Sequence, residues 1–586
     1  MLKEPKKIDE NVRKSIFKTA TKERAEKRFT WATNFDFSLV SMACVVGITN
    51  FVVFPQKCKQ HGGMAFCVPY VIVVIFMGLP LYFLETLLGQ YSGHGTIAIM
   101  NELVPAFVGI GYALVVNNFV EFMRNEVDSA RLLYLSIVTM EPTIPWAICS
   151  ASNSVACYTK ADDLYCMDKF GNTSVFFNLT CTPISTICKT LHHVNSSGEN
   201  CQQKNGSWVP YNKLIQRSTP EREFLYRHIL NMEDATLSHL GPVHWPMFFC
   251  LAACWLMTYS LGYNGFSTTA KSAYLTVFAP LFGQFLIFLK AFSLDGADEG
   301  IRAYLTFDAT SLSSKHVWID AIKTCFSSLS LGLGLIIAIG SANKPYKNCL
   351  KTTVVVILLD TLVSLASGLG FFALIGHLAH TFHMTVEELL AGETDVMFTT
   401  LPLALTSLNF PRIYVVVCYT SATLVSFGYL TAVIAMTTYD GKDIFNSFTN
   451  RRGDQEKKAS NLLIYQYNII TCTVGFTISI MFVVKGGSLV LEVTDVARHI
   501  DMSFIIASLQ AIVICFFYGS GSLLDLVEDE MGITLGRLRP YWALSWNIVA
   551  PAALAILGHT LHGNSYVPFE RQMAEGERIR RESARI

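Results

Sequence analysis

The residues from Gly47 to Tyr91 decide how this chain folds: GITNFVVFP (47–55), HGGMAFCVPY (61–70) and GLPLYFLETLLGQY (78–91). An apolar helix is interrupted there by Gly47, Thr49, Asn50 and Pro55. Within a bilayer every backbone N–H and C=O needs a partner, so a broken helix is tolerated only where it lines a cavity. Half-helices at such a cavity offer N–H groups to anions and carbonyls to cations. The stretch predicts a cavity for a small polar solute and ions, with a simple Gly/Pro kink as the alternative.

The composition is that of a polytopic membrane protein. Of 586 residues, 51% are hydrophobic and 15% are charged, the formal net charge is zero and the mean hydropathy is +0.38. No cleavable signal peptide is expected, because residues 1–30 are strongly charged without an apolar core. A spanning helix needs about 20 apolar residues, and we count eleven such segments: 36–60, 66–90, 106–138, 244–262, 271–292, 317–340, 350–378, 412–440, 461–484, 489–518 and 541–560.

Charge and glycosylation motifs predict the orientation. Ten lysines and arginines lie within residues 3–28, which places the N-terminus in the cytoplasm by the positive-inside rule. Three spans later, the loop at 140–243 combines glycosylation acceptors with cysteines, as is typical of an extracellular or lumenal segment. The acceptors are Asn172, Asn178, Asn195 and Asn205, and the cysteines are Cys149, Cys157, Cys166, Cys181, Cys188 and Cys201.

Motifs along nearly the whole chain resemble those of one family. Besides the opening stretch they are GIGYA (109–113), VWIDA (317–321), Asn343-Lys344 before Cys349, and CFFYGSG (515–521). The chain resembles the neurotransmitter:sodium symporter family from Arg28 and Trp31 to Tyr518-Gly519. The resemblance implies an all-α integral membrane fold, a LeuT-type bundle of two inverted five-helix repeats. About eleven transmembrane helices are expected, with the first and the sixth broken.

The resemblance further implies one ion site, in altered form. Its sodium-like residues are Val45, Asn50, Ser328 and Asp360, and Asp360 stands where family members have Asn. Its chloride-like residues are Tyr70, Ser328 and Ser364, with Thr324 in place of the usual Gln. Sodium and chloride are therefore the candidate ions, and no other metal or cofactor is expected.

A second sodium site is expected to be lost. Gly428 and Tyr429 match the positions where family members have small oxygen-bearing side chains on the eighth helix. Gly428 offers no side-chain oxygen, and Tyr429 would fill the volume. A register shift of one or two residues is the alternative, since Ser426 and Thr431 lie nearby.

The substrate cavity is expected to be remodelled. By resemblance its residues are Gly47, Thr49, Asn125, Ser327 and Leu333. Gly47 stands where monoamine carriers have an Asp, which argues against a monoamine, and Asn125 replaces a capping Tyr but retains hydrogen-bonding capacity.

Both gates can be matched to the family, and so can one disulfide. The outer gate keeps its acid at Asp495 but has Val53 in place of its Arg. The cytoplasmic gate retains Arg28, Trp31 and Asp443, although a basic segment held by anionic lipid is the alternative. Cys157 and Cys166 resemble the loop disulfide pair of the family.

The third span carries four charges with alternating signs. Glu121, Arg124, Asp128 and Arg131 are spaced three, four and three residues apart, so they share one helix face and neighbours can pair, whereas Glu126 points elsewhere. Charges at membrane depth almost always face a partner or a wet cavity. The ladder is either a proton- or substrate-sensing element or a self-neutralising clasp.

These patterns divide the chain into a cytoplasmic tail (1–35), a transporter domain (36–560) and a charged tail (561–586). Eleven spans would put the last tail outside, unless a twelfth span is missing from the sequence. We expect a carrier for an amino acid-like or osmolyte-like solute with altered or reduced sodium coupling. The alternative is a sensor or scaffold that does not transport.

No nucleotide-binding loop, metal-ligand spacing or catalytic triad is evident, so neither an enzyme nor a nucleic-acid-binding protein is expected. The expected partners are a small-molecule solute, membrane lipid and a cytoplasmic regulator at the N-terminal tail. The membrane is the plasma membrane or that of an intracellular vesicle.

Overall fold

The computed structural model describes residues 29–149, 157–171, 173–190, 195–197, 200–202, 208–210, 217–232, 240–344, 347–390, 396–449, 456–498, 501–549 and 551. Within these ranges, the backbone alone is described for 195–197, 209–210, 444–449, 456–464, 495–498, 501 and 530.

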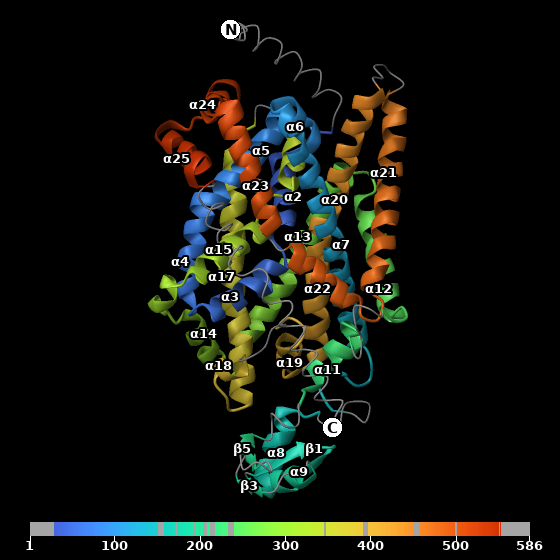
Figure 1. Cartoon of the computed structure of the whole chain (residues 1–586), viewed down its shortest axis with the longest axis vertical. Helices are drawn as coiled ribbons and strands as arrows, with labels where there is room; N and C mark the ends of the chain where they lie inside the picture. The colour runs from blue at the N-terminus through green and yellow to red at the C-terminus, as the bar shows by residue number, and fades with distance from the viewer. Residues whose placement is uncertain are drawn as a thin grey trace.

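Long helices run side by side along the length of the molecule and form its main body (Figure 1). The longest are α7 (Val108–Val138), α13 (Phe266–Ala291), α17 (Cys349–Thr381), α20 (Pro411–Thr449) and α21 (Glu456–Ser479). The other α-helices of the body are α2 (Asn34–Val45), α3 (Phe54–Gln60), α4 (Cys67–Val73), α5 (Leu79–Ser92), α6 (Thr96–Leu103), α11 (Pro220–Phe224), α12 (Trp245–Gly262), α14 (Ala297–Leu305), α15 (Lys315–Ser328), α16 (Leu335–Ser341), α18 (Val386–Leu389), α19 (Thr400–Thr406), α22 (Gly487–Arg498), α23 (Asp501–Val513), α24 (Ser520–Asp525) and α25 (Arg539–Leu544).

Short π-helical or 3-10 turns join many of these helices. The π-helical turns are η1 (Thr49–Val53), η3 (Val74–Gly78), η5 (Leu225–Ile229), η8 (Ile514–Gly519), η9 (Leu526–Glu530) and η11 (Ser545–Val549). The 3-10 turns are η2 (Met64–Phe66), η4 (Pro105–Phe107), η6 (Ala309–Ser313), η7 (Ile480–Phe482) and η10 (Gly536–Leu538).

Seven helices of the described part are long and apolar enough to cross a membrane, or eight when one bent pair is included. The bent pair joins Asn34–Val45 to Thr49–Gln60 at an angle of 53°. Not all of the eleven apolar segments expected from the sequence form such helices. The segment 317–340 is divided between α15 and α16, because the chain turns at residues 329–334, and the described part of 489–518 is divided between α22 and α23.

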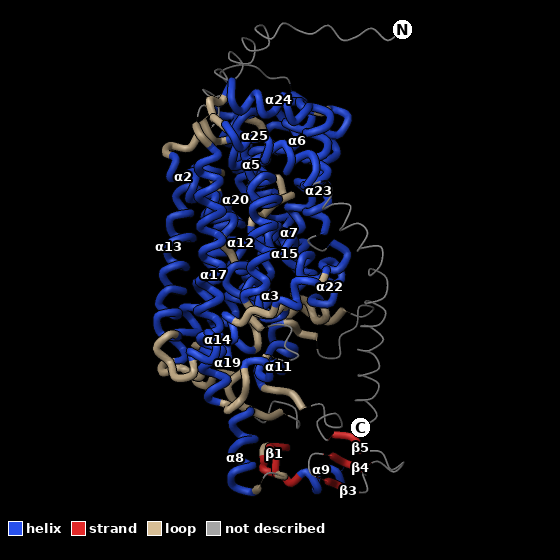
Figure 2. Tube along the Cα trace, turned by 90° about the vertical axis from the view of Figure 1, so that its left-hand side faces the viewer, coloured by secondary structure: helices blue, strands red, loops and turns tan. Residues whose placement is uncertain are grey.

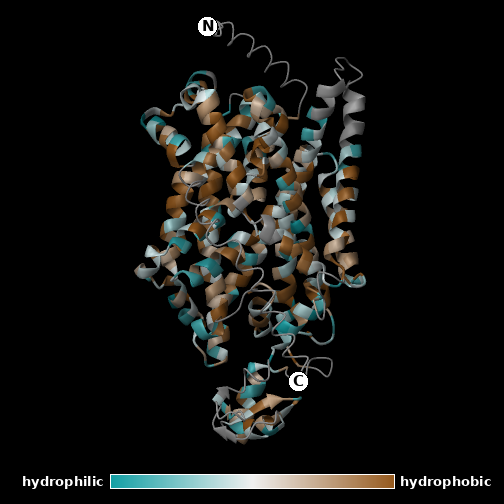
Figure 3. Ribbon diagram, viewed as in Figure 1, coloured by the Kyte–Doolittle hydropathy of each residue, from teal (hydrophilic) through white to brown (hydrophobic). Residues whose placement is uncertain are grey.

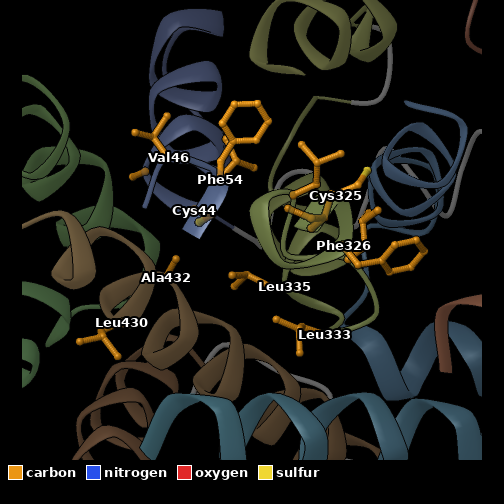
Figure 4. Packing of buried hydrophobic residues seen from close by; sticks show 14 of the residues in the cluster. Cys44, Val46, Phe54, Cys325, Phe326, Leu333, Leu335, Leu430 and Ala432 are labelled. Carbon is orange, nitrogen blue, oxygen red and sulfur yellow. The ribbon is translucent and has the colours of Figure 1, made fainter. Parts of the chain in front are cut away.

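Apolar residues cover the flanks of the body, and hydrophilic residues concentrate at its two ends (Figure 3). Helix α13 illustrates the pattern, since Phe278, Phe282 and Phe285 are all more than half exposed on it. An exposed apolar band of this extent is unfavourable in water and suits the hydrocarbon region of a bilayer. The inner faces of the helices instead pack into one buried apolar cluster, to which Cys44, Phe326 and Leu430 belong (Figure 4).

A small subdomain lies at one end of the body, which we call the subdomain end, and it contains the five strands of the described residues (Figure 2). Helix α8 (Lys160–Phe170) packs on a hairpin of β1 (Ser174–Phe177) and β2 (Thr180–Pro183). Helix α9 (Ile184–Thr190) packs on β3 (Asn195–Ser197) and β4 (Asn200–Gln202), which form an antiparallel sheet with β5 (Trp208–Pro210). Its own small core is Val175, Ile184, Ile187, Cys188 and Cys201.

Three disulfides hold the subdomain: Cys149–Cys157, Cys166–Cys181 and Cys188–Cys201. The expected pairing of Cys157 with Cys166 is therefore wrong. Cys166 lies on α8, which packs against the β1–β2 hairpin and so places it beside Cys181. Short-range packing within the loop thus determines the partners.

One of the four expected glycosylation acceptors is fully described. Asn178 is exposed in the turn between β1 and β2, with a positive φ of 50° that Asn tolerates well. Asn172 and Asn205 lie outside the described residues, and of Asn195 only the backbone is described.

We predict that disulfide mapping of the unreduced protein will recover peptides linked Cys166–Cys181 and Cys188–Cys201. Replacing Cys166 with Ser should release Cys181 as a free thiol while leaving the Cys188–Cys201 peptide intact, because the two pairs lie in separate parts of the subdomain. Mass spectrometry after thiol alkylation measures both results. A Cys157–Cys166 peptide would contradict the structure.

Candidate functional site

Two interrupted helices meet in the middle of the body. Helix α2 ends at Val45 and the chain resumes at η1, while α15 ends at Ser328 and α16 begins at Leu335. The Ser330 hydroxyl donates to the Cys44 carbonyl oxygen (2.8 Å), which joins one break to the other. The sequence permits the second break because Gly332 has a positive φ of 72°, and a Cβ there would lie 2.0 Å from the Ser503 carbonyl oxygen.

A buried polar cluster lies beside these breaks. The Asn50 amide donates to the Asp360 carboxylate (2.6 Å) and to the Ser364 hydroxyl (2.8 Å), and its nitrogen lies 3.1 Å from the Ser328 hydroxyl. Ser328 in turn donates to the same carboxylate, at 2.9 Å from Oδ2. All four side chains are at most 2% exposed. The structure thus brings together four of the expected ion-site residues, from η1, α15 and α17.

Tyr70 completes one side of this cluster. Its ring is fully buried against Phe54, with the ring centroids 4.9 Å apart. Its hydroxyl lies close to Ser328 and Ser364 without forming a hydrogen bond of good geometry to the described residues. A buried hydroxyl that lacks a well-placed partner is the kind of group that a bound ion or water satisfies.

The donor set of the cluster fits a small hard cation. Its oxygen donors, the Asp360 carboxylate and the hydroxyls of Ser328 and Ser364, are groups that such cations prefer. The Asn50 amide instead presents its NH2 group to the cluster, and its oxygen accepts from the Gly47 N–H (2.8 Å). Val45, the remaining expected sodium-like residue, ends α2 beside the central cavity. Thr324, which replaces the usual Gln, instead donates its hydroxyl to the Asp320 carbonyl oxygen in its own helix (2.7 Å). No group of three His, Cys, Asp or Glu suited to a transition metal occurs among the residues that the structure describes.

A cavity of about 490 Å³ opens next to the cluster. All five expected substrate residues line it: Gly47, Thr49, Asn125, Ser327 and Leu333. The hydroxyls of Thr49 and Ser327 lie 3.1 Å apart and bridge the two broken helices. The Asn125 amide donates to the carbonyl oxygen (2.9 Å) and the carboxylate (3.0 Å) of Glu121, so its N–H groups serve its own helix.

Several charged residues that line this cavity were not predicted as site residues from the sequence. Lys57, Asp320 and Lys323 form one wall, from α3 and α15. The Lys57 ammonium lies 2.9 Å from the Asp320 carboxylate, and His61 Nε2 lies 2.7 Å from it. The position of Asp320 in VWIDA, about two helical turns before the break in the sixth span, was the signal in the sequence that could have identified it.

The charge ladder of α7 forms the opposite wall. Arg131 pairs with Asp128 at 3.0 Å, and Arg124 lies 3.7 Å from Glu121 and 4.0 Å from Asp128. The predicted pairing between neighbours is confirmed. Glu126 points away from the ladder, as expected, and accepts a hydrogen bond from Thr258 on α12 (2.6 Å).

The expected second sodium position is tightly packed. A Cβ on Gly428 would lie 2.8 Å from the Ala43 carbonyl oxygen and 3.2 Å from the Thr276 hydroxyl. The Tyr429 hydroxyl donates to the Asn118 side chain at 2.8 Å. A register shift would not supply free oxygen ligands, because the nearby hydroxyls are used within their own helix. The Ser426 hydroxyl donates to the Ala422 carbonyl oxygen, and the Thr431 hydroxyl donates to those of Phe427 and Gly428.

The residues of the expected cytoplasmic gate lie at the opposite end from the subdomain. Trp31 is fully buried, and its indole N–H donates to the Ile339 carbonyl oxygen at the end of α16 (3.0 Å). Asp443 accepts from the Gly95 N–H (2.7 Å) at the start of α6, where a carboxylate is favoured by the helix dipole. Arg28 lies outside the described residues.

At the outer gate the structure places Val53 on the cavity wall. Asp495 belongs to α22, but its side chain lies outside the described part of the chain.

The sequence of this chain matches those of known membrane transporters. The profile of the sodium:neurotransmitter symporter family matches residues 28–178 and 169–563, which is most of the chain. The chain belongs to this symporter family. Its apolar helices and its relatives identify it as a multi-pass integral membrane protein.

Three relatives show the breadth of the family around this symporter. The sodium-dependent nutrient amino acid transporter 1 of Drosophila yakuba is 24% identical over 93% of this chain and 79% of its own length. The sodium- and chloride-dependent taurine transporter of Rattus norvegicus is 25% identical over 90% of this chain and 76% of its own length. The sodium- and chloride-dependent GABA transporter 2 of Rattus norvegicus is 25% identical over 90% of this chain and 78% of its own length.

We predict that Gly428→Ala will destabilise the symporter by about 1–3 kcal/mol, the usual cost of overpacking. The added methyl group would have to displace the Ala43 backbone. Gly109→Ala, in α7, is the matched control because nothing lies within 4 Å of its Cβ position. Thermal unfolding of the purified variants in detergent tests this, and equal melting temperatures would show that the second site is less tightly packed than described.

Proposed function

We propose that this symporter-family protein is a solute carrier that moves a small amino acid-like or osmolyte-like molecule by alternating access. The observation that best supports this proposal is the buried cluster of Asn50, Ser328, Asp360 and Ser364, which adjoins a cavity of about 490 Å³. This volume is typical of small-molecule sites. Its sodium-dependent amino acid, taurine and GABA relatives support the same class of solute.

The LeuT-type inverted repeat with broken first and sixth helices is part of this proposal. It is supported by the 53° bend after α2 and by the interruption between α15 and α16. In this arrangement the N-terminus is cytoplasmic, the subdomain is extracellular or lumenal, and Trp31 with Asp443 belongs to the cytoplasmic gate. The basic N-terminal tail is the proposed contact for lipid and for a regulatory partner.

Ion coupling is proposed to be altered. Asn50, Ser328 and Asp360 would hold one cation near the cavity, and a bound sodium ion there supplies positive charge that the substrate or Asp360 balances. At the second site, the close approach of Gly428 to Ala43 favours the loss of sodium binding. This loss also favours the second candidate, a transporter-like sensor that binds a ligand without accumulating it.

Uptake into liposomes distinguishes the carrier from the sensor. The purified protein would be reconstituted and tested with radiolabelled amino acids, taurine and GABA, with and without an inward sodium gradient. Concentrative uptake of one solute supports the carrier. A solute that raises the melting temperature of the protein but does not accumulate would identify the sensor.

We predict that any uptake will persist without chloride, and that Asp360→Asn will make it depend on chloride. The carboxylate adds one fixed negative charge one turn before Ser364, close to Tyr70, where relatives of this family hold chloride. Asparagine preserves the size of the side chain but removes the charge, so an anion must replace it. The measurement is initial uptake after chloride is exchanged for gluconate.

The matched control is Asp308→Asn. The Asp308 carboxylate lies in an exposed loop and accepts hydrogen bonds from the backbone N–H and the hydroxyl of Thr310. This variant should retain the chloride response of the parent. Strict dependence of the unmodified protein on chloride would contradict the role assigned to Asp360.

A further inference from the structure

Two free cysteines face each other where the helix that follows the first break meets the next span. Cys58 lies in the last turn of α3, and Cys67 is the first residue of α4. Their thiols are hydrogen-bonded to each other. The two residues therefore form a contacting dithiol, and neither of them belongs to the ion cluster or lines the central cavity.

A ring contact one helical turn away agrees with this placement. The ring of Phe54 in α3 lies against the ring of Tyr70 in α4, with the centroids 4.9 Å apart. Cys58 follows Phe54 by one turn, and Cys67 precedes Tyr70 by one turn. The chain reverses between them in a tight turn, in which the Gly63 N–H donates to the Cys58 carbonyl oxygen (2.7 Å). The same register thus brings both the rings and the thiols together.

The two thiols differ in their exposure. Cys58 is fully buried, and the Tyr304 side chain of α14 contacts its sulfur. Cys67 is 7% exposed, and its sulfur lies 3.6 Å from that of Met64, which is itself partly exposed. A small reagent from solvent therefore meets Cys67 before it meets Cys58.

The dithiol lies toward the disulfide-bonded subdomain. The turn after α3 is held by the segment after α14, because the Met64 N–H donates to the Thr306 carbonyl oxygen (2.9 Å). In both views α3 and α14 occupy the half of the body nearer the subdomain (Figure 1, Figure 2). Disulfides form and persist where thiols meet oxidants, so the disulfides of the subdomain place this pair on the oxidising side of the protein.

We propose that Cys58 and Cys67 are a redox site that reacts with small external disulfides and closes to a disulfide of its own. The Cys67 thiolate attacks one sulfur of the external disulfide, which forms a mixed disulfide and releases the first small thiol. Cys58 then attacks the Cys67 sulfur and releases the second. Each departing thiolate takes up the proton that a cysteine has lost. The external disulfide is reduced as the cysteine pair is oxidised, so no other oxidant is needed.

Closure would tie the helix after the first break to the second span. Helix α3 continues from η1, which carries Asn50 of the ion cluster. A crosslink between two positions nine residues apart restricts chiefly the unfolded chain. We therefore expect the melting temperature to rise by a few degrees on oxidation, and Cys58→Ser to abolish this rise.

The test is peptide mapping of the purified full-length protein after incubation with oxidised glutathione in the absence of reductant. The oxidant is then removed, the protein is denatured in an alkylating reagent, and the peptides are identified by mass spectrometry. Trypsin and chymotrypsin together separate the two cysteines, because Lys59 and Phe66 lie between them. We expect peptides linked Cys58–Cys67, and a loss of alkylation at both positions of at least about tenfold.

Single serine variants test the order of the two steps. Cys58→Ser should carry glutathione on Cys67, because the second thiol that would displace it is absent. Cys67→Ser should leave Cys58 as a thiol, because its sulfur is buried beneath Tyr304. Glutathione on Cys58 in the latter variant would overturn the assigned order.

Cys250 and Cys254 are the matched control, since they are buried free thiols one turn apart in α12 and should remain alkylatable. Equal crosslinking of these two cysteines would show that the reaction is not specific to the proposed site and would overturn it. The proposal also fails if Cys58 and Cys67 both remain thiols, or if the parent protein keeps glutathione on Cys67 without closing. Peptide mapping does not require transport, so its result is independent of the proposed carrier function.

Discussion

The structure depends on satisfying the backbone where two helices are interrupted inside the apolar body. Without water, an unpaired N–H or C=O at membrane depth costs several kcal/mol. The partners come from the other break and from a neighbouring helix. Ser330 of the second break donates to the Cys44 carbonyl of the first, and the Gly332 N–H donates to the buried Glu85 carboxylate (3.1 Å) on α5. The cavity lies where these interruptions face each other.

The need to satisfy buried polar groups also determines the surroundings of the Asp360 carboxylate. A carboxylate that is fully buried must be surrounded by donors, and Asn50 with Ser328 provides them from both broken helices. Because these donors come from two elements, η1 and α15, and the carboxylate from a third, α17, any motion of η1 or α15 changes the environment of the carboxylate. This arrangement couples the ion cluster physically to the Thr49–Ser327 bridge in the cavity wall.

Charge is distributed differently at the cavity mouth. There the groups are partly exposed and balance one another: Lys57 with Asp320 on one wall, and Arg124 with its acidic neighbours on the other. Partly exposed pairs exchange partners at small energetic cost, since each is worth only about 0–1 kcal/mol. Such pairs suit a gate, whereas the buried cluster suits a permanent site.

The sequence by itself determined the membrane character, the family and most of the residues around the cavity, because apolar length and the Gly/Pro interruptions are local properties of the chain. The alternation of Glu121, Arg124 and Asp128 likewise predicted their pairing, since helical spacing alone brings them together. The tertiary structure decided what depends on distant contacts. Cys166 pairs with Cys181 because α8 packs on the hairpin, and Asp320 lines the same cavity as Glu121, Arg124 and Asp128 because α15 and α7 both border it. It also decided that Gly428 lies against Ala43, a contact between residues nearly four hundred positions apart that no local pattern encodes.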